Sequence, residues 1–342
     1  MKKIISLLLA LTLLLGILAV PAMADSMKVG TLSYLNLTEE NGKIFTAARR
    51  PLIELLVRYG VMEGEKLLDD APAFRLYDSL NAMLMALQSG EVDAIKVPYY
   101  TGKYLCSTND GLKPRSEYHP EKATGAAAKL ALGLISDGYS FMLKEENTEL
   151  RDAFSAQIAA MKEDGTLQQL IDEHIIKAAE TGEPVAIAFE QFEGDPIKVA
   201  VTGSLPPMDY VAADGSFAGF NTAVLAEIGK RLQKNIQLVQ VDSVGRALAL
   251  SEGTVDVVFW TRGMSEIRAE RHSANGNLSE EGQEARKAES RESMAEEDQA
   301  FFDANKSIAG DTKEIFDTRD LPAGTIITQP YFSDFPSWIE LK

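Results

Sequence analysis

The sequence has little of what metal, redox or nucleic-acid chemistry needs. Its single cysteine, Cys106, excludes an internal disulfide and any multi-cysteine metal site. The three histidines are widely spaced and form no zinc-binding pattern. Only 34 Lys and Arg stand against 51 Asp and Glu, so the formal net charge is -17. Nucleic acids and anionic membranes are bound by clustered cations, so we expect no nucleic-acid partner, no metal and no cofactor.

The chain does have the size and apolar content of a folded, exported protein. Its 342 residues suggest about two domains, and 45% hydrophobic residues suffice for a packed core. Lys2 and Lys3 precede an apolar stretch at 4–20, and Ala22-Met23-Ala24 forms a small-x-small cleavage site. We interpret 1–24 as a signal peptide cleaved after Ala24, which predicts a periplasmic or extracellular protein. The alternative is a membrane anchor, because the apolar run is of borderline length.

Two stretches of the chain alternate between strand and helix patterns. Each reads strand, helix, strand, helix, strand, which predicts α/β lobes with mostly parallel sheets. The first stretch covers 28–97 and the second 197–260. A similar sequence motif lies near the end of both stretches: 87–93 reads LQSGEVD and 250–256 reads LSEGTVD. Each motif has the pattern of a helix end, a glycine turn and the start of a strand. We therefore expect two similar lobes.

The remaining segments differ in character. A strand is expected at 139–144, followed by amphipathic helices at 148–161 and 167–176. Residues 178–196 have the composition of a linker. Residues 264–318 are rich in Ser, Glu, Ala, Arg and Asn. They could form exposed helix, but we interpret them as a mobile acidic low-complexity insertion.

The second stretch carries a specific resemblance. Its strand at 197–201 is followed by Leu205-Pro206-Pro207-Met208-Asp209-Tyr210 and then by Ala218-Gly219-Phe220-Asn221. This order resembles the opening of the family 3 extracellular solute-binding proteins, the amino-acid receptors of ABC importers. Residues 140–176, which end in Asp164-Gly165-Thr166 and a helix, resemble the family's closing segment. The resemblance implies the two-lobed type II periplasmic-binding-protein fold.

The family's segments occur here in a shifted order, which predicts a circularly permuted chain. Nearby termini make such a permutation physically easy, and the rival interpretation is two partial receptors in tandem. The domains we expect are the signal peptide (1–24), a lobe II-like domain (25–138), a return segment packing on lobe I (139–177), a linker (178–196), a lobe I-like domain (197–263 and 319–342) and the acidic insertion (264–318).

The candidate ligand-binding residues lie in turns that follow strands. In lobe II, the turn after the first strand offers hydroxyl and amide groups from Ser33, Tyr34 and Asn36, although it could be an ordinary polar turn. Free N–H groups at helix N-termini would add positive potential for an anionic group. In lobe I, Met208 stands where the family often has an aromatic wall. Asp209 could bind an ammonium group or face water.

A third group follows the strand at 255–260. Trp260 offers a stacking face and Arg262 a bidentate clamp for a carboxylate, with Thr261 between them. The resemblance implies a carboxylate-binding Arg about a dozen residues past Asp256, a spacing that reaches Arg268. Arg262 and Arg268 therefore compete for the role. In lobe II the family's ammonium-binding Asp is replaced by Pro98-Tyr99-Tyr100, and Tyr99 is a candidate wall of the cleft. This departure leaves a dicarboxylate, an aromatic acid or a modified amino acid open as the ligand.

The sequence therefore predicts an exported, monomeric substrate-binding protein that delivers an amino acid or related organic acid to an ABC permease. A separate ligand-sensing receptor of the same fold is the alternative. A dehydratase-like enzyme, with Asp209 as its acid or base, is less favoured because no catalytic set such as Ser-His-Asp is discernible. We expect a binding protein and no enzyme.

Overall fold

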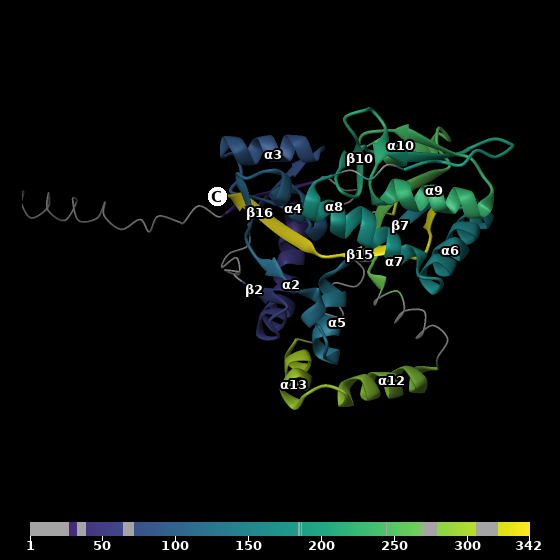
Figure 1. The fold of residues 1–342 in the computed structure, drawn as a ribbon. Coiled ribbons are helices and arrows are strands. Elements are labelled where there is room, and N and C mark those ends of the chain that lie inside the picture. The colour runs from purple at the N-terminus through teal and green to yellow at the C-terminus, as the bar shows by residue number, and fades with distance from the viewer. Residues whose placement is uncertain are drawn as a thin grey trace, which may run out of the picture.

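The computed structural model describes residues 27–32, 39–63, 72–183, 185, 187–243, 245–266, 269, 279–305 and 321–342. These residues form two α/β lobes that lie side by side in Figure 1. None of the helices within these ranges is long and apolar enough to cross a membrane. The predicted signal peptide at 1–24 lies outside the described residues.

Lobe II is built on a five-stranded sheet with the order β3-β1-β4-β16-β5. The first three strands are parallel, and β16 runs antiparallel to both of its neighbours. The strands are β1 (Lys28–Leu32), β3 (Ala73–Tyr77), β4 (Ala94–Pro98), β5 (Leu112–Pro114) and β16 (Pro336–Leu341). The helices are α2 (Glu39–Arg58), α3 (Leu80–Ser89), α4 (Tyr99–Thr108) and α5 (Ala126–Ile135). A small pair, β2 (Met62–Glu63) with β6 (Glu117–Tyr118), and a 3-10 turn, η1 (Pro120–Lys122), complete the lobe.

Lobe I has a sheet with the order β12-β8-β13-β7-β14, and β15 also pairs with β7. Its strands are β7 (Asp137–Lys144), β8 (Ile197–Val201), β12 (Ile236–Gln240), β13 (Val257–Met264), β14 (Thr325–Ile327) and β15 (Phe332–Asp334). Its helices are α6 (Thr148–Glu163), α7 (Thr166–Ile171), the π-helical turn η2 (Asp172–Lys177), α8 (Ala178–Thr181), α9 (Phe220–Leu232) and α10 (Gly245–Ser251). A three-stranded meander lies beside α9, formed by β9 (Ser204–Leu205), β10 (Asp209–Val211) and β11 (Phe217–Ala218).

The repeated sequence motif, at 87–93 and 250–256, makes the same contact in both lobes. Gly90 ends α3 at φ 75°, and Gly253 follows α10 at the same φ. The aspartate that follows each glycine then binds the first strand of its lobe. Asp93 Oδ2 accepts a hydrogen bond from the backbone N–H of Lys28 at 2.7 Å, and Asp256 Oδ2 accepts one from Lys198 at 2.8 Å. The prediction of two similar α/β lobes is confirmed.

Within the described residues, two chain crossings at a hinge connect the sheets of the two lobes. The chain passes from α5 of lobe II into β7 of lobe I, and from β15 of lobe I into β16 of lobe II. The second crossing is the yellow ribbon that runs between the lobes in Figure 1. It corrects the expected boundary, which put all of 319–342 in lobe I. Backbone pairing decides the outcome, because Ile339 pairs with Ile95 in the lobe II sheet.

The acidic insertion contains ordered helices, α12 (Glu280–Glu292) and α13 (Glu296–Ala304). Although it leaves lobe I after β13, α13 packs on the α2–α5 side of lobe II, below them in Figure 1. Asp298 is 1% exposed and binds both Arg58 and the Tyr59 hydroxyl, while Phe301 and Phe302 join the apolar cluster of lobe II. This part of the insertion is helical, and its few apolar side chains gather on α13; the interpretation of the insertion as mobile chain stays a prediction.

Candidate ligand-binding site

A cavity of about 490 Å³ lies between the lobes, beside the hinge. It opens where β4 ends at Pro98 and β13 ends at Met264, and the carboxyl ends of parallel strands are where α/β proteins bind ligands. Both lobes and the hinge segment supply its walls. The lining residues are Tyr100, Pro120, Leu132, Gly133, Ser136, Lys162, Leu167, Gln168, Ile171, Ile176, Ser265, Glu266, Tyr331, Phe332, Ser333 and Phe335.

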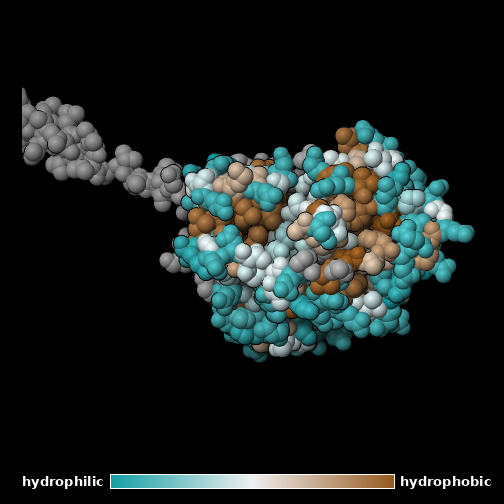
Figure 2. Space-filling model, turned by 45° about the horizontal axis from the view of Figure 1, so that its top comes forward, coloured by the Kyte–Doolittle hydropathy of each residue, from teal (hydrophilic) through white to brown (hydrophobic). Residues whose placement is uncertain are grey.

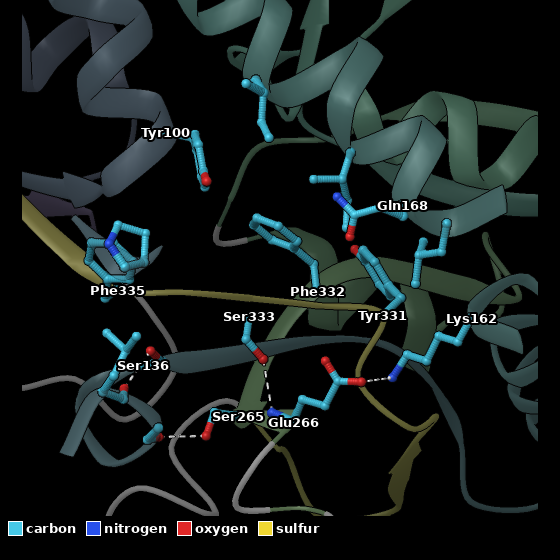
Figure 3. A pocket seen from close by; sticks show the side chains of 16 residues that line it. Tyr100, Ser136, Lys162, Gln168, Ser265, Glu266, Tyr331, Phe332, Ser333 and Phe335 are labelled. Atoms are coloured by element: carbon cyan, nitrogen blue, oxygen red, sulfur yellow. Dashed lines mark hydrogen bonds and ion pairs between the residues drawn. The ribbon is translucent and has the colours of Figure 1, made fainter. Parts of the chain in front are cut away.

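Aromatic rings from the hinge form one wall of this interlobe cavity. Figure 3 shows Tyr331 and Phe332 on the segment that enters β15, with Tyr100 approaching from α4 of the other lobe. The Tyr331 hydroxyl is fixed, since it donates to Asn221 Oδ1 at 2.8 Å and accepts from the backbone N–H of Trp260 at 3.2 Å. Burial raises the pKa of Tyr100, so its phenol stays neutral. This wall is apolar and rigid.

An ion pair forms the polar end of the interlobe cavity. Lys162 Nζ lies 2.6 Å from Glu266 Oε1 (Figure 3). It also donates to the Pro330 carbonyl at 2.9 Å. The backbone N–H of Glu266 donates to the Ser333 hydroxyl at 2.8 Å. Both charged side chains remain partly exposed, at 26% and 41%. The site therefore presents one cation and one anion to a ligand.

Ser265 and two buried aspartates connect the lobes beside the cavity. The Ser265 hydroxyl of lobe I donates to the Gly133 carbonyl of lobe II at 2.6 Å. Asp137 and Asp334 are register partners in the paired strands β7 and β15. Arg49 of α2 lies 3.2 Å from Asp137, and Arg262 of β13 lies 3.5 Å from it, so both lobes hold this hinge carboxylate.

Asp334 has different surroundings. It is 1% exposed, and its carboxylate accepts hydrogen bonds from the backbone N–H groups of Phe335, at 2.8 Å, and Tyr100, at 3.4 Å. Burial raises its pKa from 3.8 to about 8, and the two N–H groups offset this only in part. The carboxyl group at this crossing is therefore largely protonated near pH 7.

Four of the predicted site residues cannot be placed. Ser33, Tyr34, Asn36 and Arg268 lie outside the described residues. Their roles stay predictions.

Met208 and Asp209 are placed, and neither lines the interlobe cavity. Both are 0% exposed. Asp209 Oδ2 accepts hydrogen bonds from the Thr202 N–H at 2.9 Å, the Thr202 hydroxyl at 2.7 Å and the Gly203 N–H at 2.6 Å. Burial raises the pKa of Asp209, and these donors lower it. In this structure the carboxylate fixes the turn after β8.

Trp260, Thr261 and Arg262 also lie beside the cavity and not among its lining residues. Trp260 stacks on Tyr139, with ring centroids 3.5 Å apart and an angle of 11° between the planes. Thr261 is 3% exposed, and Arg262 lies against Asp137. Tyr99 lines a neighbouring cavity, and its hydroxyl donates to the Tyr118 carbonyl at 3.1 Å.

The sequence analysis missed Lys162, Glu266 and Ser333. Lys162 sits on α6, which the sequence marks only as amphipathic, and Glu266 lies at the start of the insertion. No spacing in the sequence indicates that these two residues meet. One signal was available: Glu266 follows the end of β13, the position where a ligand-contacting turn is expected.

The family comparison agrees with the resemblance found in the sequence. Residues 197–308 match the family described as bacterial extracellular solute-binding proteins, family 3. This segment is similar in sequence to that family. It contains the β8-to-α9 region and the strand β13, whose end opens on the interlobe cavity. No curated protein matches the chain.

Several solved structures of binding proteins are similar to the family 3-like chain at low identity. The aliphatic sulphonate-binding protein of Escherichia coli is 12% identical with a TM-score of 0.28, covering 69% of this chain and 54% of that chain. The glutamate-bound ligand-binding core of GluR0 from Nostoc punctiforme is 9% identical with a TM-score of 0.32, covering 92% and 85%. A phosphate-binding protein of Streptococcus pneumoniae is 10% identical with a TM-score of 0.32, covering 93% and 89%.

These likenesses add nothing to the family match, because their TM-scores are low. The chain spans about half the length of the sulphonate-binding protein.

Proposed function

We propose that this chain is an exported substrate-binding protein of an ABC importer. The observation that carries the proposal is the interlobe cavity, whose walls come from both lobes and from the hinge between them. A ligand that touches both lobes favours the closed arrangement, and a closed receptor can be distinguished from an empty one by a membrane permease. The family match of 197–308 agrees with this role. The proposal includes cleavage after Ala24 and a monomeric mature protein.

The chemistry of the cavity favours a small ligand with a charged end. Lys162 can bind a carboxylate, and Glu266 can bind an ammonium group when a ligand separates the pair. The aromatic wall of Tyr100, Tyr331 and Phe332 suits an apolar body. An amino acid satisfies all three features, and an organic acid satisfies two.

The proposal is tested by releasing bound ligand from the purified mature protein with acid and identifying it by mass spectrometry. A thermal-shift screen of amino acids and organic acids then ranks candidates. We expect at least one compound to raise the melting temperature at millimolar concentration. Absence of both a released ligand and a stabilising compound contradicts the proposal.

Two variants then separate the ligand classes. Lys162→Met should weaken binding of either class about tenfold or more, because a charge-assisted hydrogen bond is lost. Glu266→Gln should weaken binding of an amino acid and spare an organic acid that lacks an ammonium group. Lys129→Met is the control, since Lys129 is exposed on α5 and does not line the cavity. Equal affinity of the Lys162 and Lys129 variants would place the ligand elsewhere.

A further inference from the structure

One helix passes from lobe I to lobe II beside the interlobe cavity. It consists of α7, the π-helical turn η2 and α8, which follow one another without a break over 166–181, and we call it the spanning helix. Its first turn is held in lobe I, where Arg231 of α9 donates to the Thr166 hydroxyl at 2.9 Å. Its last turn lies beside α4 of lobe II, with Lys103 Nζ 3.4 Å from Glu180 Oε1 (Figure 1). The spanning helix therefore contacts both lobes.

The π-helical turn decides which side chains of the spanning helix reach the cavity. A π-turn joins residue i to residue i+5, so side chains five positions apart lie on one face. An α-helix instead aligns residue i with i+3 or i+4, which would pair Ile171 with Ile175. Here Ile171 and Ile176 both line the interlobe cavity, whereas Ile175 is 0% exposed in the core. The π-turn thus directs Ile176 to the cavity.

Apolar side chains of lobe II face the same space. Tyr100 comes from α4 and Leu132 from α5, and both keep part of their surface exposed, as Ile171 and Ile176 do. Their surface is therefore available to a ligand. On the face shown in Figure 2, apolar residues lie in separate patches among hydrophilic ones, so an apolar ligand body is better enclosed inside the cavity than on that surface.

The polar groups of the cavity leave no partner for a second charge on the ligand. Lys162 and Glu266 are the charged side chains among the described lining residues, and they pair with each other. Three other polar side chains of the lining donate within the protein: Ser136 to the Leu132 carbonyl at 2.7 Å, Ser265 to the Gly133 carbonyl at 2.6 Å and Gln168 to the Asp172 carboxylate at 2.8 Å. A charged ligand side chain among the isoleucines would lose its water without gaining an opposite charge, which is costly.

We propose that the interlobe cavity takes an amino acid with a bulky apolar side chain, and that Ile171 and Ile176 select it. This inference rests on the proposed function of the same cavity. The carboxylate and ammonium groups of the ligand bind Lys162 and Glu266, and its side chain packs on the two isoleucines and on the apolar residues of lobe II that face them. A small side chain leaves this apolar surface uncovered, and a charged side chain is left unpaired.

Calorimetric titration tests the selection on the mature protein, after bound ligand has been removed by unfolding and refolding. The probes are L-leucine, L-phenylalanine, L-alanine, L-aspartate and L-arginine. We expect L-leucine and L-phenylalanine to bind about tenfold or more tightly than L-alanine, because more apolar surface is buried. They should bind about a hundredfold or more tightly than L-aspartate and L-arginine. L-aspartate has nearly the shape of L-leucine, so the comparison of these two isolates the charge.

Two substitutions test the role of the isoleucines. Ile171→Ala and Ile176→Ala should each weaken L-leucine about fivefold and change L-alanine less than about twofold, because the methyl group of alanine does not reach either residue. Retained binding of L-alanine also shows that each variant is folded. Leu170→Ala is the matched control, since Leu170 lies on the same helix, is also partly buried and does not line the cavity. It should leave the ratio of the two affinities unchanged.

Three results would overturn the inference. The first is binding of L-aspartate or L-arginine as tight as that of L-leucine. The second is an equal effect of the Ile176 and Leu170 substitutions on the ratio of the L-leucine and L-alanine affinities. The third is failure of all five probes to bind. In that last case the acid extract of the purified protein separates the two proposals, because a small molecule of another class in the extract leaves the proposed function standing without this inference.

Discussion

Two aspartates face each other where the hinge strands pair, and their neighbours give them opposite properties. Asp137 has an arginine from each lobe beside it, whereas Asp334 accepts hydrogen bonds from two backbone N–H groups. Both sit at crossings between the lobes, so the protonation of Asp334 acts where the molecule bends. The sequence shows only two ordinary aspartates, because their difference arises from which elements pack around them.

The raised pKa of Asp334 makes folding depend on pH. Below about pH 4 the carboxyl is protonated in both the folded and the unfolded chain, so it contributes nothing to the pH dependence of stability. Between about pH 4 and pH 8 the unfolded chain releases this proton and the folded chain retains it, so stability falls as pH rises, by up to about 1.4 kcal/mol per pH unit. The gain in the free energy of unfolding that Asp334→Asn gives over the unsubstituted protein should therefore be larger at pH 8 than at pH 4. Denaturant unfolding at both values measures this.

Asp110→Asn is the control for the pH experiment, because Asp110 is exposed. Its effect should be the same at both pH values. If Asp334→Asn behaves like this control, the carboxyl of Asp334 is not held protonated by the fold.

At the scale of elements, the way the helices end explains why the repeated sequence motif folds in the same way in both lobes. Gly90 adopts a left-handed φ of 75°, and its N–H binds the last carbonyls of α3. The helix therefore ends where the strand must begin, and Asp93 is placed to bind Lys28. Local residues alone determine this junction, which is why it could be predicted from the sequence.

Gly90→Ala should lower the free energy of unfolding by about 1 kcal/mol, because an L side chain is strained at positive φ. A Cβ at this site would meet nothing within 4 Å, so the loss reports backbone strain alone. Gly125→Ala is the matched control: its surroundings are equally open but its φ is -80°, and its effect should stay within about 0.5 kcal/mol. Urea unfolding of both variants compares them, and equal losses would contradict the argument.

The docking of α13 on lobe II depends on Asp298. Replacement of this buried carboxylate by alanine should destabilise the protein by about 2 kcal/mol, since Arg58 and Tyr59 both lose their partner. Cleavage within 280–304 by a low dose of protease should also accelerate. The neighbouring exposed Glu297→Ala should change neither quantity appreciably. If both variants are cleaved at the same rate, Asp298 does not hold the helix.

At the scale of the whole molecule, the ends of the described chain lie close together. Gly30 of β1 and Ile339 of β16 both pair with Ile95, on opposite sides of β4. Strands that flank the same strand lie about 10 Å apart. Because β16 is antiparallel to β4, its last residues and the first residues of β1 lie at the same end of the sheet. This arrangement supports the proposed permutation.

A rearranged chain tests the permutation. We expect a version that joins residue 342 to residue 27 through a short Gly-Ser linker, and opens within 187–196, to fold with an unchanged circular dichroism spectrum. Its melting temperature should stay within about 5 °C, because the opened segment has no regular secondary structure and the joined ends already adjoin. A control opened within β8, at Val199, should fail to fold. Failure of both chains would contradict the proposed permutation.

Much of the fold could be predicted from the sequence, and less of the site. Hydrophobic periodicity and glycine turns are local signals, and they indicated the strands and helices of both lobes. The Lys162–Glu266 pair and the Ser265–Gly133 contact depend on how distant elements pack, which no local pattern encodes. The docking of α13 was missed because the low average apolar content of the insertion hides the few apolar residues, such as Phe301, that pack this helix on lobe II.

The position of β16 has a consequence for biosynthesis. This strand follows every described element of lobe I in the chain, yet it lies between β4 and β5, which precede them. The sheet of lobe II therefore cannot be completed before the strands of lobe I have been synthesised.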